Sequence, residues 1–170
     1  MAKFMARNNE IYFGMAAIKT VGIGAVEAII EARREAPFTS IFDFAARVDP
    51  KVVNKRILEA LVCSGAFDSL QRGHRAQLYG AIEPAVEYAR KLQVAGPSSM
   101  DSLFGEEDLV KPSEPDLPPM EKWPERERLH KEREYLNVYI SGHPLQGHAL
   151  NVHSFSTIQL STIDPSLPDT

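Results

Sequence analysis

Residues 15–33 decide the fold that this sequence predicts: Met-Ala-Ala-Ile-Lys-Thr-Val-Gly-Ile-Gly-Ala-Val-Glu-Ala-Ile-Ile-Glu-Ala-Arg. Two apolar, alanine-rich stretches flank the central Val21-Gly22-Ile23-Gly24. This alternation is typical of a helix-hairpin-helix, because glycine adopts backbone angles closed to other residues and lets the chain reverse tightly. We therefore predict helix on both sides of the turn, with the second helix running from Ala25 to about Glu35.

The predicted turn leaves the start of the second helix without a capping side chain. Uncapped N–H groups at a helix N-terminus bind anions, and the anion that fits a helix-hairpin-helix is a DNA phosphate. A contact of this kind touches only the DNA backbone, so it fixes position without reading sequence. The residues predicted to bind DNA at this hairpin are Lys19, Val21, Gly22, Ile23, Gly24 and Ala25.

Two other interpretations of this stretch are an ordinary turn and part of a nucleotide-binding glycine fingerprint. The fingerprint needs a buried strand before it and a third glycine before the helix settles. Residues 13–19 are short and poor in β-branched side chains, and the third glycine is missing. The hairpin is therefore the favoured interpretation.

Composition limits the classes of protein to which this chain can belong. With 170 residues, 44% of them hydrophobic, the chain is large enough for one domain or slightly more. The single cysteine, Cys63, excludes an internal disulfide framework, and its apolar neighbours predict a packed helix residue rather than a nucleophile. Because the sequence has no signal-like start and no apolar run of membrane-spanning length, we expect a cytoplasmic location and no membrane partner.

The net charge of −4 is unevenly distributed along the chain. Residues 1–96 carry 13 Lys and Arg against 10 Asp and Glu, residues 97–125 carry 2 against 8, and residues 126–170 carry 4 against 5. The part that holds the hairpin is thus mildly basic, which is compatible with phosphate contact but does not establish it.

A second helical unit follows the first hairpin. Ser40 and Asp43 form a capping-box-like pair at the start of one helix, and Asn54 is the predicted cap of the next, Lys55–Ser64. The turn 64–67 could belong to a degenerate second hairpin. Its basic edge, and its predicted DNA-binding residues, would then be Lys51, Lys55 and Arg56. The alternative is that these three charges are only solvated.

The remainder of the chain divides by composition. A helix is predicted from His74 to about Val94, kinked or split by Pro84. Residues 96–124 then contain six of the twelve prolines and most of the surplus acid, which predicts an extended linker. Pro124 then begins a last helix that Ser141-Gly142 ends, and its charged run 125–134 is interpreted as a solvated face.

The predicted fold class is all-α, a small helical bundle built on tandem helix-hairpin-helix motifs, with an extended Pro- and acid-rich linker and a C-terminal helix. The expected parts are a tail of an upstream element (1–13), the tandem hairpin domain (14–95), the linker (96–123), the helix (124–145) and a tail that leads to a next, absent domain (146–170). The sequence also indicates a short strand that ends near Phe13, after an Asn8-Asn9 turn.

The order of these pieces resembles one region of a known family. The resemblance is carried by residues 13–22, by Phe42-Asp43-Phe44, by 54–61, by Ser64-Gly65-Ala66-Phe67-Asp68, by His74-Arg75-Ala76 and by Tyr139-Ile140-Ser141-Gly142-His143-Pro144-Leu145. In this order and spacing they are similar to the alpha subunit of the bacterial replicative DNA polymerase III, a C-family polymerase. The likeness covers nearly the whole chain. The sequence departs from the family at Ala16 and Thr20, where the family often has glycine.

The resemblance implies that the whole protein is a DNA polymerase and that this region is its tandem helix-hairpin-helix domain between fingers and OB-fold. In the family the catalytic aspartates and their Mg²⁺ ions lie in the palm, and further metal ligands lie in an N-terminal phosphoesterase-like domain. Nothing in this sequence corresponds to either site. We therefore expect no catalytic residues, no metal and no cofactor in this segment. Its implied partners are double-stranded DNA and, through the full-length protein, the other replicase subunits.

The resemblance also implies a peptide that binds the sliding clamp. The family carries it in this linker as a glutamine, two variable residues, then an aliphatic residue and a phenylalanine. Leu103 and Phe104 match that pattern, whereas Met100 stands in the glutamine place. The alternative is that Leu103 and Phe104 pack back on the helical domain.

Two further interpretations compete with the DNA-binding one. The chain could be a protein-interaction scaffold, in which the linker binds the clamp and the hairpins are structural. It could also be a hairpin-bearing glycosylase, which is disfavoured because no aspartate follows the hairpin at a suitable distance on a helix. His143, His148 and His153 recur every five residues, a spacing that would not place them on one helix face, so a zinc site is not expected.

Overall fold

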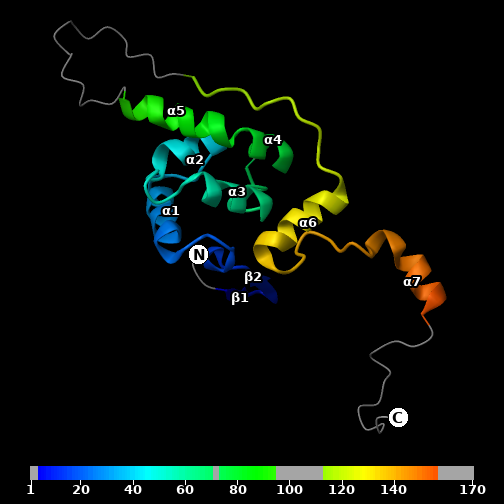
Figure 1. Cartoon of the computed structure of the whole chain (residues 1–170). Helices are drawn as coiled ribbons and strands as arrows, with labels where there is room; N and C mark the ends of the chain where they lie inside the picture. Colours follow the sequence, from blue (N-terminus) through cyan, green and yellow to red (C-terminus); the bar gives the residue numbers. More distant parts are fainter. Residues whose placement is uncertain (1–3, 71–72, 95–112, 157–170) are drawn as a thin grey trace, which may run out of the picture.

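The computed structural model describes residues 4–70, 73–94 and 113–156, and helices dominate these ranges (Figure 1). The first described element is a β-hairpin, in which β1 (Met5–Arg7) pairs antiparallel with β2 (Glu10–Tyr12). Asn8 and Asn9 form its turn with φ of 52° and 62°. Two successive left-handed residues are what a tight two-residue hairpin requires, and Asn tolerates this conformation. The expected strand before Phe13 is thus confirmed.

The first hairpin consists of a single 3₁₀ turn, η1 (Met15–Ala17), and a regular helix, α1 (Ile23–Glu35). The expectation of a full helix before the turn is wrong. Ile18 already has extended backbone angles, with φ −73° and ψ 126°, and its side chain enters the core. Only three residues therefore separate Gly14 from this change of direction, which allows no more than one turn.

Helices α2 (Ile41–Arg47) and α3 (Lys55–Cys63) begin at the caps that the sequence indicates. Ser40 Oγ accepts a hydrogen bond from the N–H of Asp43 at 2.9 Å, and Asn54 Oδ1 accepts one from the N–H of Ile57 at 3.1 Å. Each bond satisfies an N–H group that the first turn of a helix leaves free. The Asp43 carboxylate accepts from the N–H of Thr39 rather than from Ser40.

The helix expected from His74 to Val94 is split into α4 (Arg75–Gly80) and α5 (Ile82–Val94). The break lies at Ala81, and Pro84 is the third residue of α5. Proline in a first turn breaks no intrahelical hydrogen bond, because those N–H groups have no partner within the helix. The split is therefore confirmed, but it precedes the proline.

The core lies where α2 packs on α5 and where α3 contacts α4, α5 and α6 (Figure 1). Its largest fully buried apolar side chains come from these helices and from α1. They are Val26, Ile41, Phe44, Leu58, Leu61, Val62, Ile82 and Leu129. Burial of such side chains contributes about 1.5 to 3 kcal/mol each and is the main term that holds the bundle together.

The described end of the linker lies on the helical domain. Ser40 Oγ donates a hydrogen bond to Glu114 Oε1 at 2.9 Å, and Gln77 Nε2 donates one to the carbonyl of Pro118 at 3.3 Å. His74 Nε2 lies 3.1 Å from the carbonyl oxygen of Met120. Residues 113–124 are irregular, as the prolines predict, yet these contacts hold them against α2 and α4.

Helix α6 (Glu125–Leu136) ends earlier than the sequence indicates. Asn137 is left-handed, with φ 62°, and its N–H donates to the carbonyl of Arg133 at 2.8 Å. A left-handed residue closes a helix by satisfying a terminal carbonyl. The prediction that Tyr139 and Ile140 belong to this helix is therefore wrong.

Beyond α6 the structure has a 3₁₀ turn, η2 (Gln146–His148), and a helix, α7 (Ala149–Phe155), where the sequence predicts only a tail. In Figure 1, α7 extends away from the other helices, and Leu150 and Phe155 on it are more than four fifths exposed. Within the described ranges no helix has the length and apolar character needed to cross a lipid bilayer.

Candidate nucleic-acid interface

The candidate interface begins at the turn that joins η1 to α1. The N–H of Val21 donates to the carbonyl of Ile18 at 3.1 Å, and both side chains are buried. Between them, Lys19 and Thr20 are exposed. The apolar residues at either end of the turn therefore anchor it to the core, while its middle faces solvent.

The N-terminus of α1 has free N–H groups. Its cap residue is Gly22, which has no side chain to accept hydrogen bonds from these groups. The first backbone hydrogen bond of the helix runs from the N–H of Val26 to the carbonyl of Gly22 at 3.2 Å. In the described part of the chain no hydrogen bond engages the N–H groups of Ile23, Gly24 or Ala25. Such a helix start favours an anion.

The two glycines of the hairpin serve a different purpose from the one that the sequence predicts. Gly22 has φ −74°, which any residue can adopt, and Gly24 lies within α1 and is not among the residues with positive φ. The left-handed residue of this turn is Thr20, with φ 72°. A Cβ added at Gly22 or at Gly24 would meet nothing within 4 Å. Their missing side chains thus leave open surface over the free N–H groups.

The turn is held in place from the far end of the chain. The N–H of Lys19 donates to the carbonyl of Tyr135, in the last turn of α6, at 2.9 Å. Helix α6 is fixed in turn by Glu132, whose side chain is completely buried. The prediction that residues 125–134 form only a solvated face is wrong at this position.

Glu132 joins three segments of the chain. Its Oε2 accepts a hydrogen bond from Arg75 Nη1 at 2.8 Å, and its Oε1 accepts from the N–H groups of Ile140 and Ser141 at 2.6 and 2.8 Å. Arg75 also donates from Nη2 to Asp68 Oδ2 at 2.6 Å. The cluster ties α4, α6 and the turn after α3 together.

Burial and hydrogen bonding act in opposite directions on this cluster. Burial disfavours the ionised carboxyl of Glu132, yet hydrogen bonds from Ser141, Arg75 and Ile140 outweigh it and hold the pKa of Glu132 below its ordinary value. Burial also disfavours the charged guanidinium of Arg75, but its bonds to Asp68 and Glu132 raise its pKa. Both groups are therefore charged at neutral pH.

Sequence reasoning missed this cluster, although a signal was present. Glu132 lies three residues after Leu129 and four before Leu136, so it occupies the stripe of α6 that faces the core. A charged residue on an apolar stripe indicates a buried partner. Cys63, by contrast, is buried as predicted, and burial raises the pKa of its thiol to about 11.

The turn 64–67 does not offer an open anion site. Gly65 has φ +83°, and a Cβ there would lie 2.2 Å from a guanidinium nitrogen of Arg75. The space beside this turn is therefore filled by the Arg75 cluster. Here the glycine is required by its conformation and by the close approach of a side chain, in contrast to Gly22 and Gly24.

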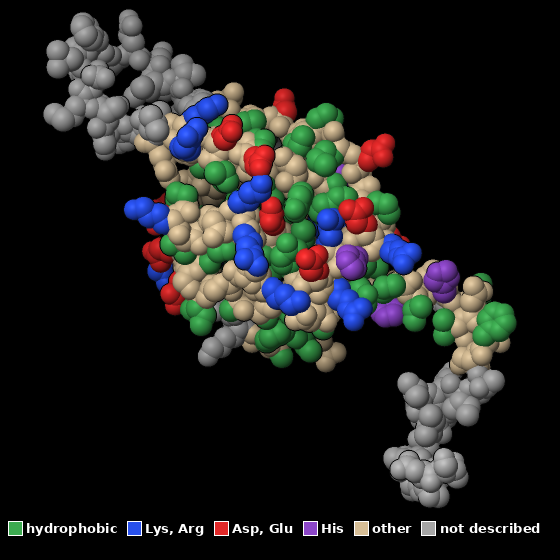
Figure 2. Space-filling view, viewed as in Figure 1, with side chains coloured by type: hydrophobic (Ala, Val, Ile, Leu, Met, Phe, Trp, Pro, Cys, Tyr) green, Lys and Arg blue, Asp and Glu red, His purple; other side chains and the backbone are tan. Residues whose placement is uncertain are grey.

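The structure separates this turn from its predicted basic edge. Lys51, Lys55 and Arg56 are exposed near the N-terminus of α3, whereas the turn follows its C-terminus, about 13 Å away along a nine-residue helix. Lys55 forms a salt bridge with Glu83 of α5. On the face shown in Figure 2, Lys and Arg side chains lie among Asp and Glu side chains rather than in one continuous basic patch.

Comparison with known proteins identifies the family. A helix-hairpin-helix motif model matches residues 1–78. The chain is 40% identical over 136 residues to the DNA polymerase III subunit alpha of Campylobacter jejuni, 41% identical over 140 residues to that of Vibrio cholerae, and 39% identical over 142 residues to that of Bacillus subtilis. These matches cover 79 to 84% of the chain. The chain belongs to the DNA polymerase III alpha subunit family.

The alpha-subunit segment spans only 11 to 12% of the length of these relatives. Three of the six segments that carry the family resemblance meet in its structure. Ser64–Asp68, His74–Ala76 and Tyr139–Leu145 each contribute to the Arg75–Glu132 cluster or adjoin it. These three segments therefore take part in attaching α6 to the hairpin domain.

The predicted clamp-binding residues Met100, Leu103 and Phe104 lie outside the described residues. As for metals, no group of three or more His, Cys, Asp or Glu side chains in the described ranges could hold an ion. The carboxylates of Asp68 and Glu132 both bond to Arg75, so they do not present a free set of oxygen ligands. His143 Nδ1 accepts from the N–H of Leu145 at 3.2 Å.

Proposed function

We propose that this segment is a non-catalytic module that binds duplex DNA without sequence specificity. Its whole protein would be a DNA polymerase III alpha subunit that carries out template-directed synthesis in chromosome replication, in the cytoplasm and with Mg²⁺ held elsewhere in the polypeptide. The observation that supports the binding role best is the start of α1, where three N–H groups are free and two glycines leave the surface above them open.

This site would hold a phosphate by backbone contact. The N–H groups of Ile23, Gly24 and Ala25 would donate to phosphate oxygens, and the exposed Lys19 would add one cation beside them. Val21 positions these groups because its side chain is buried beneath the turn. Lys51, Lys55 and Arg56 lie on a second edge, and any contribution from them would be purely electrostatic.

A fluorescence anisotropy titration of the segment against a labelled duplex, repeated over a range of salt concentrations, tests the proposal. Because few phosphates are neutralised, the slope of log affinity against log salt should be on the order of −2 to −4. Gly22→Val and Gly24→Val should abolish binding, since a branched side chain would cover the N–H groups. Gly147→Val is the matched control, because Gly147 also has nothing within 4 Å but lies in η2.

Two results would contradict the proposal. One is unchanged affinity in both hairpin variants with their helix content retained. The other is equal loss of affinity in the Gly147→Val control. Primer extension or nuclease activity that depends on magnesium and is lost when residues of this segment are changed would overturn its non-catalytic role.

The alternative function is a protein-interaction scaffold whose linker binds the sliding clamp. Its support is the sequence alone: Leu103 and Phe104 stand where the family carries a clamp peptide, with Met100 in the glutamine place. Two apolar anchors contribute a few kcal/mol, part of which is lost to ordering, so micromolar affinity is expected. In a titration against purified clamp, Phe104→Ala should remove most binding and Met100→Gln should improve it. Absence of wild-type binding would refute this alternative.

A further inference from the structure

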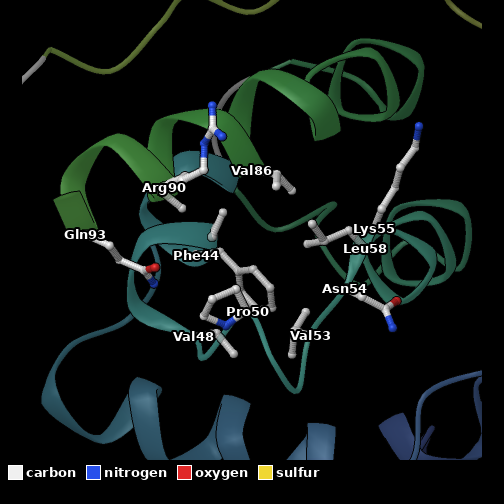
Figure 3. A pocket seen from close by; sticks show the side chains of 12 residues that line it. Phe44, Val48, Pro50, Val53, Asn54, Lys55, Leu58, Val86, Arg90 and Gln93 are labelled. Atoms are coloured by element: carbon white, nitrogen blue, oxygen red, sulfur yellow. The ribbon is translucent and has the colours of Figure 1, made fainter.

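An apolar groove lies between α2, α3 and α5, away from the free N–H groups at the start of α1 that carry the DNA-binding proposal. Its volume is about 370 Å³. Figure 3 shows the apolar side chains that surround this hollow. Phe44 belongs to α2 and Val48 follows its end, Val53 precedes α3 and Leu58 belongs to it, and Val86 belongs to α5. The groove is of the size that holds a small apolar ligand or one or two side chains.

The rim of the groove is polar and carries two cations. Arg90 on α5 and Lys55 on α3 rise on different sides of the hollow, with their charged ends away from its floor (Figure 3). Lys55 pairs with the exposed Glu83, while Arg90 forms no ion pair within the described ranges. An apolar floor below two cations fits a peptide with apolar anchors and neighbouring carboxylates.

We propose that this groove binds residues 101–108 of the same chain, Asp-Ser-Leu-Phe-Gly-Glu-Glu-Asp. Leu103 and Phe104 would enter the apolar floor, and the acidic residues after them would face Arg90 and Lys55. The octapeptide has four carboxylates and no Lys or Arg, so its charge is complementary to the rim. These residues lie outside the described ranges, and the proposal rests on the groove, the composition of the peptide and its tether.

The chain on both sides of the peptide is attached to walls of the groove. Gln93 lines the groove one residue before α5 ends, and Leu103 follows Val94 by nine positions. Nine residues reach up to about 30 Å, whereas the groove extends only about 10 Å along α5, from Val86 to Gln93. On the other side, Glu114 bonds to Ser40, the cap of α2, a helix that supplies another wall.

Because the peptide is linked to the groove by the chain itself, weak contacts between them are sufficient for binding. A peptide joined to its site by a short linker has an effective concentration in the millimolar range, so an intrinsic affinity of this order is enough for substantial occupancy. Leu103 and Phe104 could not occupy this groove and a partner's groove together. Binding in cis would therefore shield two apolar side chains from solvent and would compete with any partner that recognises them. The inference goes beyond the proposed DNA binding and does not depend on it.

Disulfide trapping in the whole 170-residue chain tests the inference. Val86→Cys introduces a thiol at the exposed side of the groove, and Ser102→Cys introduces one beside the anchors. The matched control pairs Ser102→Cys with Ile23→Cys, whose position is 65% exposed at the DNA-binding hairpin. Cys63 is buried and adds little background. The groove pair should form its disulfide at least about tenfold faster than the control pair, because docking raises the local thiol concentration.

Replacing both anchors, Leu103→Ser with Phe104→Ser, should reduce the groove pair to the control rate. Gln93→Cys serves as a second groove position should the Val86 variant fail to fold. Equal rates for groove and control pairs would overturn the inference, and so would a fast rate that survives loss of the anchors. A rate that rises with protein concentration would also overturn it, by identifying a second copy of the chain as the occupant. Since no DNA is present, these outcomes are independent of the proposed function.

Discussion

Arg75 and Glu132, 57 positions apart in the sequence, share a buried, hydrogen-bonded ion pair with Nη1 and Oε2 2.8 Å apart. The pair joins α4 to α6. Three residues after Glu132, the carbonyl of Tyr135 accepts the N–H of Lys19 at the first hairpin. The candidate DNA-binding turn is therefore positioned by a helix that lies more than a hundred residues further along the chain.

Glu132→Ala should destabilise the fold strongly. The change leaves a buried guanidinium with only Asp68 as its acidic partner and removes the acceptor of the Ile140 and Ser141 N–H groups. Breaking one side of a buried pair costs about 3 to 5 kcal/mol. Urea unfolding followed by circular dichroism measures the loss. Glu127→Ala, which breaks the exposed pair with Lys131 on the same helix, is the control and should change stability by less than about 0.5 kcal/mol. Equal loss of stability in the two variants would contradict the structural role assigned to Glu132.

Stability should fall in acid because of Glu132. Its pKa is lower in the folded state than its ordinary value of 4.5, so the unfolded state binds the proton more tightly. The stability contributed by its ionised form is thus fully present above pH 4.5 and is lost as the pH falls through the lower, folded-state pKa. Urea unfolding from neutral pH down to acid should show this loss. The slope should be shallower in Glu132→Gln, and an unchanged slope in that variant would exclude Glu132 as its source.

Gly24→Ala should stabilise the fold while weakening binding to duplex DNA. Position 24 is helical, and an added methyl group meets nothing within 4 Å, so replacing glycine should stabilise α1 by about 0.5 to 1 kcal/mol. The same methyl group would stand over the free N–H groups. Thermal unfolding and anisotropy titration of the same sample measure both effects. A variant that is more stable and binds DNA as well as the wild type would show that the phosphate does not approach this surface.

Gly65→Ala should have the opposite effect on stability. Alanine would be forced to φ +83°, and its Cβ would lie 2.2 Å from Arg75, so the turn or the buried cluster must move. Strain at a left-handed position alone costs on the order of 1 to 3 kcal/mol, and displacement of Arg75 adds to it. Urea unfolding measures the stability of Gly65→Ala, and Gly24→Ala is measured under the same conditions for comparison. Equal stability of the two variants would refute the different roles assigned to these glycines.

Local signals in the sequence predicted much of the secondary structure. Ser40 and Asn54 cap α2 and α3 because their side-chain oxygens reach N–H groups within three residues, an interaction that the sequence contains in full. The Asn8-Asn9 turn is also local, because Asn tolerates the left-handed conformation that the turn requires. Prediction failed at Ile18, where the chain leaves the helix so that this side chain enters the core, and at Asn137, where a left-handed residue closes α6 before Tyr139.

The order of motifs in the sequence was sufficient to determine the polymerase alpha-subunit family, the helical class and the position of the first hairpin. Only the tertiary structure decided which charges are buried and what each glycine does. It paired Glu132 with Arg75, separated Lys51, Lys55 and Arg56 from the turn 64–67, and left Gly22 and Gly24 in open space while it packed Gly65 against Arg75. The physical reason is that caps and turns depend on neighbours within a few residues, whereas desolvation of a charge and the space around a Cα depend on segments that only folding brings together.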